Sequence, residues 1–241
     1  MPLKELAFRR ALQHQQSDAE AIVAHAIGDV EIGRVAMVSS FGAESVVLLH
    51  MLARVNPATP VIFLDTEMLF PETLSYQRDV AERLGLTDVR QITPSREALI
   101  ERDIDGILHQ FDTDACCTLR KTEPLERALE GFNAWITGRK RVQGGARAQM
   151  PIYEKEDGAA RIKINPLASW TPKMIADYMD RHELPRHPLV ARGFKSIGCA
   201  PCTTKVAEGE DPRAGRWRGQ EKTECGIHFV NGKPQRQESA A

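Results

Sequence analysis

The sequence predicts an α/β fold in which an open, mostly parallel sheet carries helices on both faces. Short apolar runs that end in small or polar residues alternate with segments of helical character along most of the chain. Alternation of this kind is typical of parallel strands joined by right-handed crossovers. With 241 residues, of which 42% are hydrophobic, the chain can bury one sizeable core.

The predicted elements follow one another in a regular order. Residues 1–16 read as an amphipathic helix, and the capping-box pattern from Ser17 to Glu20 predicts a helix that ends near Gly28. The predicted strands cover residues 34–39, 61–64, 88–92 and 134–137, and the later helices cover residues 44–55, 71–84, 95–102 and 171–182. Residues 201–241 have few apolar anchors, so we expect a mobile C-terminal tail.

Charge and hydrophobicity exclude several classes of partner. The chain has 32 basic and 33 acidic residues, so no net charge attracts it to nucleic acid or to a membrane. The N-terminal segment lacks the apolar core of a secretory signal, and no later stretch is long enough to cross a membrane. We therefore expect a cytoplasmic protein that binds anions only through local clusters of cations.

Polar and basic residues follow three of the predicted strands. They are Ser39, Ser40, Phe41 and Gly42, then Leu64, Asp65 and Thr66, then Arg139, Lys140, Arg141 and Arg147. Loops at the carboxyl ends of parallel strands converge on one cleft. The serine-rich turn before a helix suits a phosphate or sulfate, although plain turns have the same composition. Asp65 could contact a ribose or simply cap the next turn, and the GxxxxGKS pattern of a Walker loop is absent.

Four of the five cysteines form two close pairs, Cys116 with Cys117 and Cys199 with Cys202. In a reducing compartment, two such pairs favour a metal site over a disulfide framework. Both zinc and a 4Fe-4S cluster accept four thiolates. Adjacent residues point in different directions, which favours the larger iron–sulfur cluster. A thioredoxin-like CxxC is the other interpretation, but this one follows Gly198 late in the chain.

The fifth cysteine, Cys225, lies alone near the C-terminus. Arg213, Arg216 and Arg218 precede it, and nearby cations lower the pKa of a thiol and make it a better nucleophile. The alternative is an incidental cysteine on a tail. Because exposed free thiols are a liability, the pattern favours a functional one.

With these motifs the sequence resembles the assimilatory sulfonucleotide reductases, in particular the cluster-containing adenylylsulfate reductases, over almost the whole chain. Residues 39–44 are similar to the family's modified pyrophosphatase-type loop, 64–66 to its LDT strand end, and 139–147 to its arginine-rich loop. The paired cysteines resemble its cluster signature, and residues 224–228 its catalytic ECGLH tail. Glu67 replaces the usual glycine after LDT, and Ile227 replaces the usual leucine.

The resemblance implies an adenine nucleotide alpha hydrolase-like fold, with a nucleotide-binding domain and cluster site in residues 1–200 and the catalytic cysteine in residues 201–241. It implies that the Cys225 thiolate attacks the sulfur of adenosine 5'-phosphosulfate and expels AMP, leaving a Cys225 S-sulfonate. Thioredoxin or glutaredoxin then releases sulfite. His228 and Lys140 join Cys225 as catalytic residues.

The resemblance also assigns the remaining residues of the site. A 4Fe-4S cluster in a structural or electrostatic role would be held by Cys116, Cys117, Cys199 and Cys202. The substrate would be bound by Ser39, Ser40, Phe41, Gly42, Leu64, Asp65, Thr66, Arg139, Lys140, Arg147, Arg213, Arg216 and Arg218.

Three alternatives remain open at the level of sequence. The first is a reductase that prefers 3'-phosphoadenylylsulfate, although such enzymes usually lack the cluster cysteines. The second is an ATP pyrophosphatase, although the usual SGGxDS pattern is absent. The third is a non-catalytic iron–sulfur sensor. The sequence also leaves open whether the chain forms a homo-oligomer.

Overall fold

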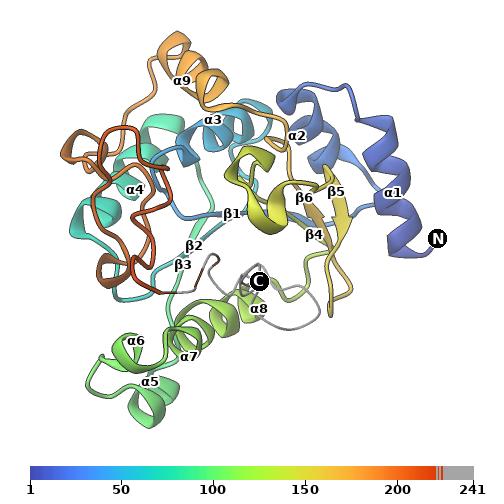
Figure 1. The fold of residues 1–241 in the computed structure, drawn as a ribbon. Coiled ribbons are helices and arrows are strands. Elements are labelled where there is room, and N and C mark those ends of the chain that lie inside the picture. The colour runs from blue at the N-terminus through green and yellow to red at the C-terminus, as the bar shows by residue number, and fades with distance from the viewer. Residues whose placement is uncertain (221, 223, 225–241) are drawn as a thin grey trace, which may run out of the picture.

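A six-stranded sheet with the strand order β3-β2-β1-β4-β6-β5 forms the centre of the molecule (Figure 1). The computed structural model of the chain describes residues 1–220, 222 and 224. The strands are β1 (Val35–Ser39), β2 (Val61–Leu64), β3 (Val89–Ile92), β4 (Ala134–Ile136), β5 (Tyr153–Lys155) and β6 (Ile162–Ile164). All neighbouring strands are parallel except β5 and β6. The predicted open, mostly parallel sheet is confirmed.

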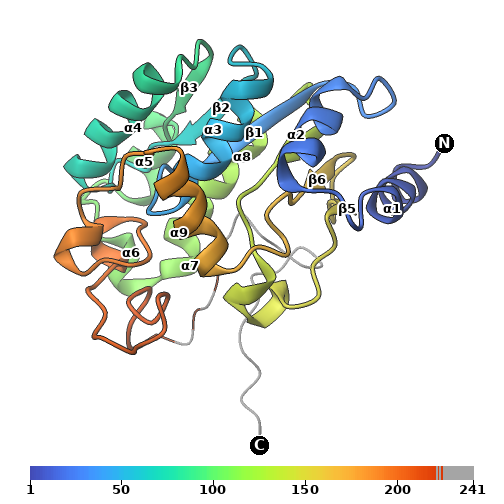
Figure 2. The same ribbon diagram turned by 90° about the horizontal axis from the view of Figure 1, so that it is seen from above.

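Helices cover both faces of this sheet, as predicted (Figures 1 and 2). One face carries α2 (Ala19–Gly28), α3 (Ser45–Val55), α4 (Pro71–Leu84) and α9 (Pro172–Arg181), and the other carries α8 (Glu123–Ala128). Apolar side chains of β1 and β2 alternate between the two layers: Met37 and Phe63 pack into one, and Ala36 and Ile62 into the other. Two cores therefore hold the central strands in place.

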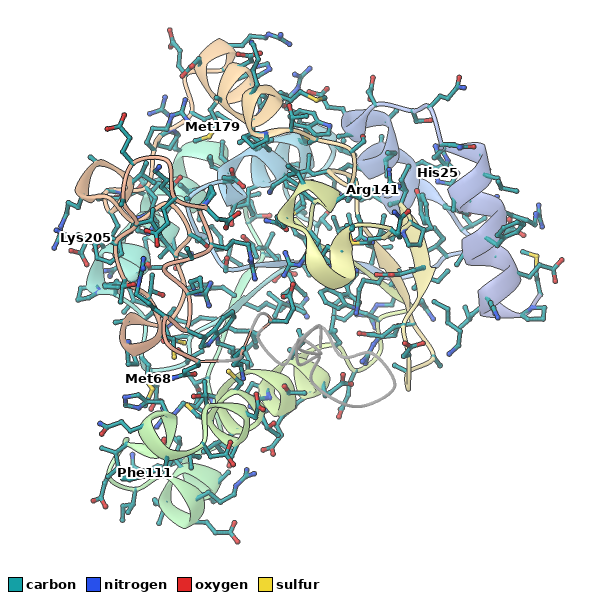
Figure 3. All side chains as sticks on the ribbon, viewed as in Figure 1. His25, Met68, Phe111, Arg141, Met179 and Lys205 are labelled. Carbon is teal, nitrogen blue, oxygen red and sulfur yellow. The ribbon has the colours of Figure 1, made fainter. Side chains whose placement is uncertain are left out.

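Three short helices form a projection below the body of the molecule in Figure 1, and a further helix lies at the sheet edge. The projection contains α5 (Arg96–Arg102), α6 (Leu108–Phe111) and α7 (Thr113–Cys117). Phe111 lies on this projection (Figure 3) and is 79% exposed. The helix at the edge, α1 (Leu3–Gln13), packs beside β5. A π-helical turn (Thr118–Thr122) connects α7 to α8.

The structure corrects and extends the predicted elements. The N-cap of α2 is Asp18 and not Ser17, because the Asp18 carboxylate accepts the Ala21 amide hydrogen. The predicted cap at Thr171 is confirmed, since its hydroxyl accepts from the Met174 amide. The sequence analysis did not identify β5, β6 or the helices α6, α7 and α8.

The first part of the predicted C-terminal tail packs against the rest of the chain. Thr203 and Arg216 form an antiparallel bridge, and the Trp217 amide donates to the Cys202 carbonyl at 3.1 Å. Trp217 is buried. Residues 201–220 therefore fold over the second cysteine pair, whereas residues 225–241 lie outside the described part of the chain.

No helix within the described residues is both long enough and apolar enough to cross a membrane.

A buried histidine predicts how stability depends on pH. The His187 imidazole accepts the Leu189 amide hydrogen through Nδ1, and its Nε2 lies 3.1 Å from the Thr73 hydroxyl. This arrangement suits the neutral ring, and burial lowers the pKa of His187 from 6.5 to about 4. As the pH falls from about 6.5 to 4, the unfolded chain binds a proton at His187 that the folded chain does not bind, so stability falls.

We expect the His187→Gln variant to lose less stability over this pH range than the wild type, by up to about 3 kcal/mol. Urea unfolding of both proteins at pH 7 and at pH 4.5 measures the difference. Equal losses of unfolding free energy in the two proteins would contradict the assignment.

Candidate active site

A cavity of about 390 Å³ opens at the carboxyl ends of β1, β2 and β4. Its volume is within the range of small-molecule sites. The three loops predicted to converge do so here, because the parallel strands deliver them to the same side of the sheet. Of the substrate-binding residues predicted from the sequence, all but Phe41, Asp65 and Arg218 line the cavity.

The loop after β1 is shaped by its own hydrogen bonds. The Ser39 hydroxyl accepts from the Phe41 amide, and the Ser45 hydroxyl accepts from the Gly42 amide. Phe41 has a φ of 46° and a fully buried ring that packs edge-on against Phe63. The ring of Phe41 anchors the loop in the core, and a role of Phe41 in substrate binding stays a prediction.

The loop after β2 holds its aspartate in local contacts. Asp65 accepts from the Gln91 side-chain amide at 2.7 Å and from the Glu67 backbone amide at 2.9 Å. It caps the turn, which was the alternative left open by the sequence, and its side chain does not line the cavity. Glu67 is exposed and has a φ of 57°, a left-handed conformation that favours glycine. This backbone geometry gives a physical reason for glycine at that position in the family.

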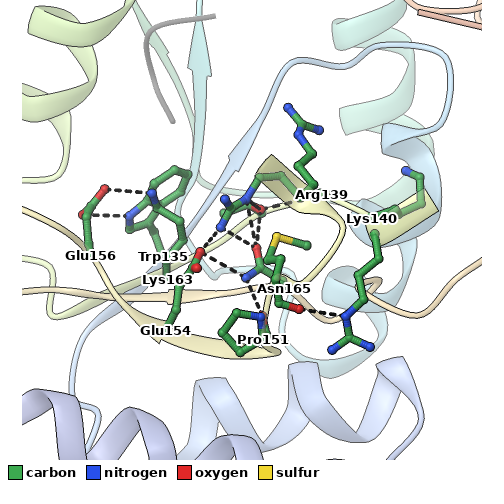
Figure 4. Close-up of polar contacts among 12 residues, drawn as sticks. Trp135, Arg139, Lys140, Pro151, Glu154, Glu156, Lys163 and Asn165 are labelled. Atoms are coloured by element: carbon green, nitrogen blue, oxygen red, sulfur yellow. Dashed lines mark hydrogen bonds and ion pairs between the residues drawn. The ribbon is translucent and has the colours of Figure 1, made fainter. Parts of the chain in front are cut away.

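Most of the predicted cations at the cavity are already paired with acidic groups. Lys140 forms an ion pair with Glu44 at 2.8 Å. Arg139 forms an ion pair with Glu154 and donates to the Asn165 side chain, and burial lowers the pKa of its guanidinium. Figure 4 shows the fully buried Asn165 between Arg139, Glu154 and Pro151. These pairs fix the shape of the arginine-rich loop.

Arg147 is paired with the C-terminal segment. Its Nε and Nη2 each donate to a carboxylate oxygen of Glu224 at 2.5 Å, and its Nη1 donates to the Gln143 side chain. Both side chains of the ion pair are buried. Glu224 directly precedes Cys225 in the sequence. Cys225 and His228, the predicted catalytic residues in the tail, lie outside the described residues.

Arg218 lies away from the cavity, and Arg216 lies in its wall. Arg218 forms an ion pair with Glu210 at 2.7 Å on the surface, and its role in substrate binding stays a prediction. Arg216 stacks on the Trp217 ring with its guanidinium carbon 4.4 Å from the ring centre. Within the described part of the chain, its Nε is buried without a hydrogen-bond partner and no carboxylate pairs with it. Arg216 is therefore a cation available for an anionic ligand.

The four paired cysteines gather beside this cavity. Cys116 and Cys117 end α7, and Cys199 and Cys202 flank a short 3-10 turn. The pKa of the Cys116 thiol is raised to about 12, mainly by burial and further by the thiols of Cys117, Cys199 and Cys202. These three thiols therefore lie close enough to Cys116 to interact with it electrostatically. No three acidic, histidine or cysteine side chains among residues 1–220, 222 and 224 form a group that could hold a metal ion.

Cys199 connects the thiols to the cavity, which it helps to line. The Thr66 hydroxyl lies 3.2 Å from its sulfur. Burial works to raise the pKa of Cys199, but Lys121, Thr66 and Arg216 outweigh this effect and lower it. Lys121 also lines the cavity, and the sequence analysis missed it. Its position four residues after Cys117 was the available signal, but the π-helical turn that carries it was not predictable.

A buried ion pair holds this region together and was also missed. Arg120 donates to Asp103 through Nε and Nη2 at 3.0 and 2.7 Å, and through Nη1 to the Thr66 carbonyl at 2.9 Å. Asp103 also accepts from the Leu108 amide. The pair therefore connects the projection, the first cysteine pair and the end of β2.

The fold and the site define a class of protein: an α/β protein with a mostly parallel sheet, a cationic cavity at the strand ends and a cysteine, Cys199, in the cavity wall. A family model described as "phosphoadenosine phosphosulfate reductase domain" matches residues 34–205. The chain belongs to this reductase family.

Curated relatives match over most of the chain. An adenosine 5'-phosphosulfate reductase from Mesorhizobium japonicum is 55% identical over 81% of this chain and 76% of its own. A protein of the same name from a Chelativorans species is 52% identical over 88% of this chain and 86% of its own. A phosphoadenosine 5'-phosphosulfate reductase from Gloeobacter violaceus is 42% identical over 90% and 91% of the two chains.

Solved structures have the same fold. The crystal structure of a phosphoadenylyl-sulfate reductase from Candida auris in a phosphate complex is similar with a TM-score of 0.71 and 27% identity, over 84% of this chain and 97% of that one. The FMN adenylyltransferase of Candida glabrata shares the fold alone, with a TM-score of 0.56 and 15% identity over 88% and 78% of the chains.

Arg216 packs directly against Gly198, so a larger residue at position 198 should weaken ligand binding without unfolding the protein. A Cβ atom at residue 198 would lie 2.3 Å from Nη2 of Arg216, whose flexible side chain would have to move. We expect Gly198→Ala to lower the affinity for AMP about tenfold, because it displaces a charge-assisted contact, while the unfolding midpoint changes little. Calorimetric titration and thermal unfolding measure the two quantities.

Gly28→Ala is the matched control, since a Cβ at residue 28 meets no atom within 4 Å. Wild-type AMP affinity in Gly198→Ala, or an equal loss in the control, would contradict the role of Arg216.

Proposed function

We propose that this chain reduces adenosine 5'-phosphosulfate to sulfite and AMP in sulfate assimilation, as an adenylyl-sulfate reductase that uses the Cys225 thiol. The observation that carries the proposal is the Arg216 guanidinium in the cavity wall. Its Nε is buried and has no hydrogen-bond partner, and no acidic side chain of the described residues pairs with it. A sulfate or phosphate group is the ligand that such a guanidinium binds best. The names of the relatives at 52–55% identity support the same substrate.

The proposed reaction has two steps that balance. The Cys225 thiolate forms a bond to the sulfate sulfur, and the bond from that sulfur to the bridging oxygen breaks, so AMP leaves with the electron pair. In the second step one thiolate of a dithiol protein such as thioredoxin or glutaredoxin attacks the Cys225 sulfur, so that a mixed disulfide forms and sulfite leaves with the electron pair. The other thiolate of the dithiol protein breaks the mixed disulfide, which returns the Cys225 thiolate and leaves the dithiol protein as a disulfide. Arg216, Arg213 and Lys140 would offset the repulsion between the thiolate and the anionic substrate. In this proposal His228 assists proton transfer.

We propose that Cys116, Cys117, Cys199 and Cys202 hold a 4Fe-4S cluster. An all-thiol donor set is typical of zinc or iron–sulfur groups. Burial and the thiols of Cys117, Cys199 and Cys202 all raise the pKa of Cys116, which supports a shared environment for the four sulfur atoms. When bound, such a cluster supplies charge next to Cys199 and rigidity to the cavity wall. Lys121 and Arg216 balance the charge of the thiolates.

A second candidate is reduction of the 3'-phosphorylated nucleotide. The Gloeobacter violaceus relative and the Candida auris structure carry names of that activity. The four cysteines and the higher identity to the adenosine 5'-phosphosulfate reductases favour the unphosphorylated substrate. Sulfite release from equal concentrations of the two nucleotides distinguishes the candidates.

Incubation with adenosine 5'-phosphosulfate without reductant tests the nucleophile. We expect a sulfonate adduct on Cys225 in peptide mass spectrometry, because the second step cannot proceed without a thiol donor. Addition of reduced thioredoxin should release the adduct as sulfite. Cys225→Ser should form no adduct and retain the affinity for AMP; an adduct on another cysteine would refute the assignment.

Replacement of Cys116 by serine tests the cluster. We expect iron and sulfide content and the visible absorbance to fall to near background, because a serine hydroxyl is a poor ligand for the cluster iron. The matched control Cys225→Ser should keep the iron and the absorbance of the wild type. A zinc content of one per chain without iron would contradict the proposed cluster.

A further inference from the structure

The ion pair between Arg147 and Glu224 lies where the arginine-rich loop meets the C-terminal segment. Its two hydrogen bonds, each 2.5 Å long, use both carboxylate oxygens of Glu224. The Arg147 and Glu224 side chains are only 8% and 10% exposed. Bidentate pairs of this kind fix orientation as well as distance. They are therefore suited to hold a segment in one position.

Arg147 has little capacity left for a second anion. Its Nη1 donates to the Gln143 side chain, which also accepts from the Lys140 backbone amide. All three nitrogen atoms of the guanidinium are thus engaged within the protein. Arg213 lies on the other side of Glu224, with 3.7 Å between its Nη2 and the carboxylate. The carboxylate is enclosed by cations, which prevents it from repelling an anionic substrate.

The same segment has a second attachment, to helix α7. Lys222 forms an ion pair with Asp114 on α7 and donates to the Thr113 carbonyl. The Thr113 hydroxyl donates to the Gln220 side chain at 2.9 Å. Residues 220 and 222 are therefore attached to the helix that ends in Cys116 and Cys117, and residue 224 to the arginine-rich loop. The segment spans these two elements.

We propose that Arg147 and Glu224 form a clasp that holds Glu224 at the arginine-rich loop, and that Arg147 is a positioning residue for the reaction of the adjacent Cys225 and not a ligand of the substrate. This inference rests on the proposed function, in which Cys225 is the nucleophile. Because one peptide bond separates Glu224 from Cys225, the clasp restricts where the thiol can lie. Small errors in the position of a reacting group are costly for rate and leave binding unchanged.

The test compares Glu224→Gln, Arg147→Gln and the double variant. At saturating adenosine 5'-phosphosulfate and without reductant, we expect each single variant to form the Cys225 sulfonate about a hundredfold more slowly than the wild type. The affinity for AMP should stay within about twofold of the wild type, since the two side chains pair with each other. The double variant should be no slower than either single variant, because the two residues act as one unit.

Glu210→Gln is the matched control. This variant removes the 2.7 Å ion pair between Glu210 and Arg218, which lies in the same C-terminal segment as the clasp. Unlike the clasp, this ion pair is exposed to solvent and lies away from the cavity. We expect wild-type rates of sulfonate formation in this variant. Thermal unfolding of all variants identifies any that fail to fold, and Glu224→Gln keeps the shape of the side chain.

A second measurement, the rate of trypsin cleavage, does not depend on whether Cys225 reacts with the substrate. Trypsin should cleave after Lys222 about tenfold faster in Glu224→Gln than in the wild type or the control, because loss of the clasp raises the open population of the segment. If the wild type itself forms no Cys225 sulfonate, the proposed function fails, whereas the trypsin result still reports on the clasp.

Two outcomes would overturn the inference. If Arg147→Gln weakens AMP binding tenfold or more and Glu224→Gln strengthens it, Arg147 is a substrate ligand for which Glu224 competes. If the two single variants react at the wild-type rate and resist trypsin as the control does, the pair does not position the segment.

Discussion

The contact between the Thr66 hydroxyl and the Cys199 sulfur is the junction on which the site depends. Thr66 lies in the loop two residues after β2, whose register is set by the strands beside it, and Cys199 belongs to a loop far along the chain. The Thr66 carbonyl also accepts from Arg120, which follows Cys117 by three residues and pairs with Asp103. One residue thereby aligns the sheet, both cysteine pairs and the cavity. Removing one partner of a buried pair such as Arg120 with Asp103 typically costs about 3–5 kcal/mol.

The sequence was sufficient to predict the central strands and the convergence of the three loops. Strands β1 and β2 are buried on both faces, so they read as continuous apolar runs, and the parallel arrangement brings their carboxyl ends together. Strands β5 and β6 have only three residues each, too few to show a pattern. The helices α6 and α7 have only four and five residues, and the carboxylates of Asp103 and Asp112 accept amide hydrogens at their first turns, a contact that periodicity does not reveal.

The pairing of the cations could not be predicted from composition. The arginine-rich loop reads as a set of free positive charges, yet Arg139 and Lys140 are held by Glu154 and Glu44, which are distant in sequence. Such contacts depend on tertiary structure alone. A loop with so many cations close together would repel itself without these carboxylates. The acidic residues therefore keep the loop folded, and Arg216 remains to meet an external anion.

The position of α1 beside β5 bears on how copies of the chain can associate. The helix lies along the outer side of this last strand, with Leu6 and Ala7 buried, so the backbone of β5 is shielded from a strand of another molecule (Figures 1 and 2). At the other edge, Arg90 of β3 places a charge on the outermost strand. Sheet extension from one molecule to the next is blocked at one side and opposed at the other. The two edges of the sheet therefore disfavour association of copies through one continuous sheet.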